Sequence, residues 1–186
     1  MTTRVLRNGV NVTQLVDTIE AIKKDPALAR FQFRARTVWE EGGRCHTEIQ
    51  DFAGAGGEDT SRPAPFMLVG DEPPVLLGGN AGPNAVEAAL HALASCLSVG
   101  FVYNAAATGI DITSLEFDLD GDIDLLGFLG LSDEVRPGYS NIAVRYRVQA
   151  NAPRERLVAL CDYVQRTSPV LDMLRNPVPV TVELVS

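Results

Sequence analysis

The pattern of hydrophobic and polar positions alternates between a helical and a strand period along the chain. Apolar residues recur at helical spacing over 12–24 and 154–167, which predicts two amphipathic helices. Strand-like alternation predicts strands over 31–39, 45–52, 112–124 and 142–148. We also expect a turn at 41–44, a mobile loop at 53–65, short strands at 66–69, 74–77 and 178–184, a loop at 125–140, and a short helix at 169–174. This order predicts an α+β fold with mostly antiparallel pairing.

One segment follows neither amphipathic pattern. From 88 to 107 nearly every residue is small or apolar, which is typical of a helix that is buried or spans a membrane. The polar residues His91, Ser98 and Asn104 would be costly in lipid, so we expect a central helix covered on all sides. A chain of 186 residues can hardly cover such a helix alone, and the pattern therefore favours a homodimer.

The start of this helix allows two interpretations. Asn84 and Glu87 have the spacing of a capping box, whereas Pro83 in the first turn would place the cap at Gly82.

Composition narrows the class of protein. Lys and Arg number 16 against 24 Asp and Glu, a net charge of −8, which argues against binding nucleic acid or an anionic membrane surface. Part of this charge lies on the polar face of 116–124, where Arg145 and Arg147 are expected to pair with it across strands. Three cysteines are too few for a secreted disulfide scaffold, and residues 1–9 hold no apolar signal core, so we expect a cytoplasmic protein.

Cys96, in the middle of the apolar helix, is the main candidate for chemistry. It is either a reactive thiol in a dry pocket or a small buried hydrophobic residue, the common fate of a free cysteine. A reactive thiol needs a nearby cation or helix N-terminus, and the local sequence offers neither.

Other combinations of polar residues are weaker. Glu87 and His91 share a helix face and would suit a metal, but no third ligand is evident, and Glu87 also suits a helix start. Cys45 and His46 are adjacent on a strand and point to opposite faces. No phosphate-binding loop or paired-cysteine zinc motif is present, so we expect neither a metal nor a cofactor.

Three segments together resemble the OsmC/Ohr family of thiol-dependent hydroperoxide reductases. They are Gly82–Glu87 leading through His91 into Cys96, the turn Glu41–Arg44, and Ser168-Pro169-Val170 followed by 178–183. The resemblance covers 31–186 and leaves 1–30 as an added N-terminal helical extension. It implies an OsmC-like fold in which antiparallel sheets wrap the long central helices of an intertwined homodimer.

The resemblance also implies roles for single residues. Cys96 would be the thiolate that attacks the peroxide, and Arg44 would stabilise that thiolate and polarise the peroxide. The family's second, resolving cysteine precedes Pro-Val, where this chain has Ser168. Cys161 lies seven residues earlier and would resolve Cys96 only if its helix packs differently. The family's glutamate falls at Val86, one position before Glu87, and Glu87 is the candidate for that catalytic role.

The first functional hypothesis is an enzyme of oxidative stress defence that reduces organic hydroperoxides, with Cys96 oxidised to a sulfenic acid and restored by an external thiol or by Cys161. The alternative is an OsmC-like dimer that binds a small apolar or thiol ligand at its interface without turnover. In either case the expected partners are a second copy and a small-molecule hydroperoxide or thiol.

Overall fold

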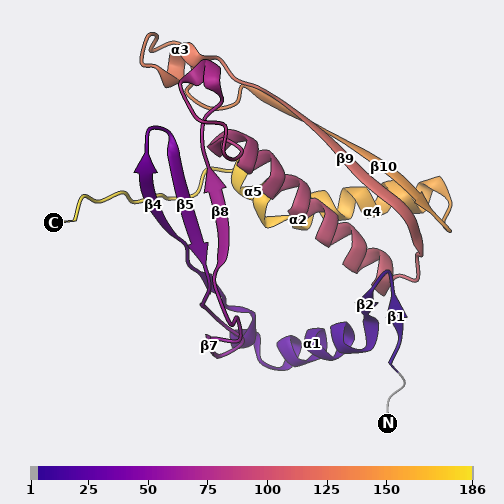
Figure 1. The fold of residues 1–186 in the computed structure, drawn as a ribbon. Helices are drawn as coiled ribbons and strands as arrows, with labels where there is room; N and C mark the ends of the chain where they lie inside the picture. Colours follow the sequence, from indigo (N-terminus) through magenta and orange to yellow (C-terminus); the bar gives the residue numbers. More distant parts are fainter. Residues whose placement is uncertain (1–3, 186) are drawn as a thin grey trace. The chain divides into compact units, whose positions relative to one another are not determined.

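The computed structural model describes residues 4–185, which form two compact units. The first unit is built from Thr13–Ala89, and the second combines Val5–Val12 with the chain from Leu90 onward. Figure 1 shows the course of the chain. The mixture of helices with antiparallel sheets confirms the predicted α+β class.

The first unit holds the helix α1 (Val12–Lys24), two short 3₁₀ helices, of which the first is Pro26–Ala29, and two small sheets. Helix α1 has the predicted bounds. One sheet has the order β4-β5-β8 and the other β3-β6-β7, with antiparallel neighbours throughout. Their bounds are β3 Gln32–Phe33, β4 Arg36–Glu41, β5 Arg44–Ile49, β6 Phe52–Gly54, β7 Gly57–Asp59 and β8 Phe66–Gly70.

Several short predictions in this unit need correction. The turn between β4 and β5 is confirmed, with Gly42 at a positive φ of 52°. The expected loop at 53–65 instead contains the hairpin β6–β7, whose turn places Ala55 and Gly56 at positive φ. The expected strand at 74–77 is a 3₁₀ helix, Pro74–Leu76, because proline lacks the N–H that a strand ladder needs.

The second unit contains the hydrophobic core. The long antiparallel pair β9 (Ile112–Asp122) and β10 (Asn141–Ala150) packs with α2 (Ala85–Ala107) and α4 (Arg154–Thr167) around Leu97, Phe101 and Val164. The predicted ion pairs across the strands are confirmed: Arg145 pairs with Asp120, and Arg147 with Glu116 and Asp118. The remaining elements are α3 Leu125–Phe128, inside the expected loop, α5 Pro169–Arg175, β1 Leu6–Arg7 and β2 Val10–Asn11.

Helix α2 is covered on one face only in the single chain. Leu93, Leu97, Phe101 and Ala105, each one turn apart, are buried, whereas Val99 and Tyr103 on other faces are about half exposed. One copy of the chain therefore leaves part of α2 exposed, and the expected cover on all sides, which requires a second copy, stays a prediction. Among the described residues, α2 is the helix long and apolar enough to cross a membrane, yet its buried face belongs to the core of the second unit.

The structure of both ends of the chain differs from what the sequence pattern predicts. The hairpin β1–β2 lies in the second unit, where the Asn8 side chain donates to the Ile110 carbonyl and accepts from the Ile112 N–H. The predicted strand 178–184 is wrong for the single chain: these residues form neither helix nor strand, and Val180, Val182 and Leu184 are 77–103% exposed. A strand needs a hydrogen-bonding neighbour, and none pairs with this segment in one copy.

Candidate functional site

The start of α2 is held by a reciprocal pair of hydrogen bonds. The Glu87 N–H donates to Asn84 Oδ1 over 2.9 Å, and the Asn84 N–H donates to Glu87 Oε2 over 2.8 Å. This is the capping box, so the alternative cap at Gly82 is wrong. The carboxylate of Glu87 is exposed and caps the helix; its suggested catalytic role stays a prediction.

Cys96 contacts a hydroxyl group from the far end of the sequence. Its Sγ lies 3.1 Å from the Oγ of Ser168, 72 residues away, and the thiol is partly buried rather than enclosed. Ser168 is only 5% exposed, and its Oγ also accepts the Leu171 N–H over 3.3 Å, which caps α5. The position that would carry the family's second sulfur therefore holds a hydroxyl group in hydrogen-bonding contact with Cys96.

A cavity opens beside this pair within the second unit. It has a volume of about 420 Å³ and is lined by Ser95, Cys96, Val99, Gly100, Val164, Thr167, Ser168 and Pro169. Its polar lining groups are hydroxyls, the thiol and backbone, and no charged side chain contributes to it. The cavity suits a small, largely apolar molecule whose reactive atom meets the Cys96 sulfur.

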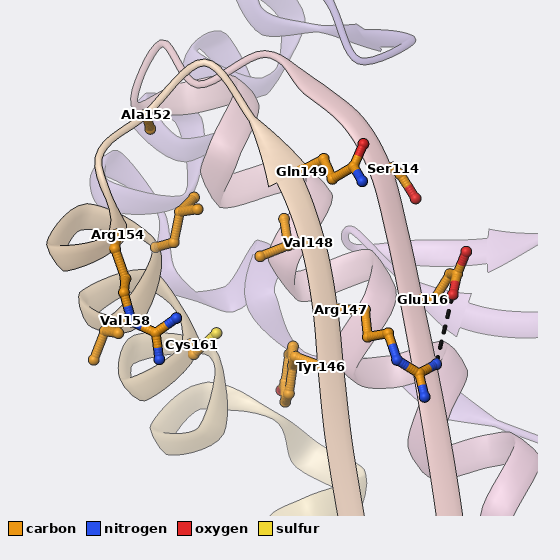
Figure 2. A pocket seen from close by; sticks show the side chains of 11 residues that line it. Ser114, Glu116, Tyr146, Arg147, Val148, Gln149, Ala152, Arg154, Val158 and Cys161 are labelled. Carbon is orange, nitrogen blue, oxygen red and sulfur yellow. Dashed lines mark ion pairs between the residues drawn. The ribbon is translucent and has the colours of Figure 1, made fainter.

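Cys161 lies in a different cavity. Figure 2 shows its side chain extending from α4 into a cavity of about 620 Å³, which Tyr146 and Val148 of β10 also line. The linings of the Cys96 and Cys161 cavities share no residue. Burial, and then the charge of Asp162, raise the pKa of the Cys161 thiol, so that it is a poor nucleophile at neutral pH.

Tyr146 is a neighbour of both thiols that the sequence did not reveal. Burial raises the pKa of Tyr146 to about 12; the charges of Cys161 and Cys96 act in the same direction, and Arg175 opposes them. The buried Tyr146 hydroxyl has no hydrogen-bond partner among the described residues. Strand alternation predicts that Tyr146 faces inward, but no sequence signal links it to two cysteines.

Arg44 belongs to the first unit, on β5. Its Nε donates to Glu40 Oε2 over 2.9 Å, and Glu40 Oε1 lies 2.7 Å from Nδ1 of His46. The buried Asp71 is also near: hydrogen bonds from the Ala81 and Glu72 N–H groups lower its pKa, with a smaller contribution from Arg44. Because Cys96 belongs to the second unit, the expected action of Arg44 on its thiolate stays a prediction.

The remaining candidate residues have local partners. Nε2 of His91 lies 3.4 Å from Oγ of Ser95, one turn along α2. Within residues 4–185, no three His, Cys, Asp or Glu side chains cluster closely enough to hold a metal ion. Cys45 pairs with Trp39 in the ladder of β4 and β5, and Gly70 of β8 lies opposite its sulfur.

The family model for OsmC-like proteins matches residues 78–183, more than half of the chain, including α2, Cys96 and Ser168. The chain belongs to the OsmC-like protein family. The resemblance drawn from the three sequence segments is thereby confirmed. Among curated proteins, none matches the sequence.

Solved structures of OsmC-like proteins share the fold at low sequence identity. An OsmC-like protein from Mycoplasma pneumoniae is 16% identical with a TM-score of 0.59, the match covering 78% of this chain and 89% of that one. An OsmC-like protein of unknown function from Vibrio cholerae is 12% identical (TM-score 0.55; 76% and 92% covered). An organic hydroperoxide resistance protein OsmC from Legionella pneumophila is 13% identical (TM-score 0.53; 78% and 90% covered). At these identities the likeness establishes the fold alone.

Proposed function

We propose that this OsmC-like protein reduces organic hydroperoxides in oxidative stress defence, with Cys96 as the reactive thiol. The observation that carries the proposal is the position of the Cys96 sulfur in the wall of an apolar cavity of about 420 Å³. The name of the Legionella pneumophila relative, an organic hydroperoxide resistance protein, supports the same class of substrate. The apolar lining favours an alkyl or aryl hydroperoxide over hydrogen peroxide.

The chemistry needs no metal or organic cofactor. The Cys96 thiolate attacks the terminal oxygen of the hydroperoxide, so that an S–O bond forms as the O–O bond breaks. The peroxide is reduced to an alcohol, whose alkoxide takes up a proton, and the sulfur is oxidised to a sulfenic acid. A thiol then condenses with the sulfenic acid and releases water, and a second thiol exchanges with the mixed disulfide to restore Cys96.

Arg44 is proposed to supply the positive charge for this step. A guanidinium group stabilises a thiolate and the charge that develops on the leaving oxygen. Its present partner, Glu40, leaves its remaining N–H groups available, because one guanidinium carries five donors.

The assembly is proposed to be a cytoplasmic homodimer. Apolar side chains that one chain leaves exposed support this, and they come from three separate segments: α2, β8 and the C-terminal residues. They include Val99 and Tyr103 on α2, Phe66, Met67, Leu68 and Val69 on β8, and Val178, Val180, Val182 and Leu184. An exposed apolar patch is typical of a protein interface.

The test is the fate of the Cys96 thiol. Addition of cumene hydroperoxide is expected to convert Cys96 to a sulfenic acid within minutes, which dimedone labelling and mass spectrometry of the Cys96 peptide would detect. Cys96→Ser should lower turnover with an added thiol at least about 100-fold, whereas Cys45→Ser, on a strand of the other unit, should leave it unchanged.

The apolar cavity also supports the second candidate, a dimer that binds a small apolar or thiol ligand without turnover. Cys96 would then remain unmodified in excess hydroperoxide, and the alcohol product would bind saturably. These two results together would favour the binding function over the enzyme.

A further inference from the structure

The hydrogen bond between Ser168 and Cys96 has a direction that depends on the charge of the sulfur. A serine hydroxyl has one proton to donate and two lone pairs that accept. The Leu171 N–H occupies one lone pair of the Ser168 Oγ, and the Cys96 sulfur is its other partner. Against a thiolate, which has no proton, the hydroxyl must donate.

Deprotonation of Cys96 therefore strengthens this contact. A hydrogen bond to an ionised acceptor is about twice as strong as one between neutral groups. Because Ser168 is 5% exposed and is held by its cap on α5, its hydroxyl reaches the sulfur without further ordering. The charged state of the sulfur gains more from Ser168 than the neutral state does.

The same contact decides how an oxidised Cys96 is restored. Oxygen cannot form a disulfide, so Ser168 cannot resolve a sulfenic acid on its neighbour. Cys161 lies in a cavity that shares no lining residue with that of Cys96, and burial raises its pKa. A reductant from solution can reach the sulfur through the cavity that opens beside it.

We propose that Ser168 is a positioning residue that stabilises the Cys96 thiolate through its hydroxyl, and that its place beside the sulfur commits the sulfenic acid to reduction by a low-molecular-weight thiol from solution. The second half rests on the proposed function; the first half does not.

The thiolate half is tested by alkylation of Cys96 with iodoacetamide, which needs no peroxide. Ser168→Ala should slow alkylation of the Cys96 peptide at pH 7 by about 10-fold and move the pH profile upward, since a hydrogen bond to a charged group is lost. Ser168→Thr, which keeps the hydroxyl, should restore both. Tyr146 on β10 interacts electrostatically with Cys96, and these variants leave both Tyr146 and the proposed Arg44 in place.

Thr108→Val is the matched control. Thr108 also belongs to the second unit, but its hydroxyl donates to the Asn104 carbonyl over 2.7 Å, and it does not line the Cys96 cavity. Its replacement should leave the alkylation profile unchanged. Equal profiles for wild type and Ser168→Ala, or an equal slowing in Thr108→Val, would overturn the positioning role.

The reduction half is tested by Ser168→Cys. One equivalent of cumene hydroperoxide should leave a dimedone-reactive sulfenic acid in the wild type, whereas Ser168→Cys should lose two thiols and form a Cys96 disulfide within the chain. Wild-type turnover should rise with the concentration of added monothiol. An intrachain Cys96–Cys161 disulfide in the wild type would overturn this half, and an absence of any Cys96 oxidation would instead contradict the proposed function.

Discussion

At the scale of single residues, the hydroxyl of Tyr146 is an unusual group in the core of the second unit. The Tyr146 ring packs edge-on against Phe117, with centroids 4.6 Å apart, and against Phe101 at 6.0 Å. Folding buries its hydroxyl away from water, and the hydroxyl gains no hydrogen-bond partner among the described residues. Such a group costs free energy that the ring's packing offsets.

Tyr146→Phe is therefore expected to raise the free energy of unfolding by about 1 kcal/mol, because it removes an unsatisfied polar atom and keeps the ring. The folded pKa of about 12 lies above the ordinary value of 10.0, so the wild type should lose stability as pH rises from 10 to 12. Urea titrations at pH values from 10 to 12 should show a smaller decline in the free energy of unfolding for the variant than for the wild type. A variant less stable than wild type at pH 7 would contradict the argument.

At the scale of elements, the capping box at the start of α2 separates two roles for Glu87. In its observed position the carboxylate accepts the Asn84 N–H, and the side chain is exposed. A glutamine at this position makes the same hydrogen bond, whereas it cannot act as a carboxylate base.

Glu87→Gln should thus leave thermal stability within about 0.5 kcal/mol of wild type and should keep hydroperoxide turnover. Asn84→Ala, which removes the reciprocal half of the cap, should cost about 1 kcal/mol. Thermal unfolding and a coupled turnover assay measure the two quantities. A ten-fold loss of turnover in Glu87→Gln with unchanged stability would make Glu87 a catalytic residue.

At the scale of the whole molecule, the C-terminal residues have the composition of a strand without a neighbour. Val178, Val180, Val182 and Leu184 alternate with more polar positions, and all are exposed in one copy. A second copy of the chain is the partner that the proposed homodimer supplies.

Val182→Asp should convert the proposed dimer to single chains of 20.0 kDa, because a buried unpaired carboxylate would oppose association. Val75→Asp is the matched control: Val75 is 85% exposed, close to the 89% of Val182, but lies on the 3₁₀ helix of the first unit. Sedimentation equilibrium should give twice the chain mass for wild type and for the control. A wild-type mass of one chain would dismiss the proposed assembly.

The sequence by itself determined what depends on neighbouring residues. Helical and strand periods located α1, α4 and the pair β9–β10, and charge alternation on that pair predicted the ion pairs of Arg145 and Arg147. Short elements such as β6–β7 escaped prediction because two or three residues carry no measurable period.

Only the tertiary structure decided which distant residues meet. It placed Ser168 against Cys96, put Cys161 in another cavity, and left the Tyr146 hydroxyl without a partner. Local spacing encodes the hydrogen bonds of a helix or a strand pair, whereas contacts between residues 72 positions apart arise from how whole elements pack. For that reason the sequence identified Cys96 as the candidate thiol, but it did not predict the contact between Cys96 and the Ser168 hydroxyl.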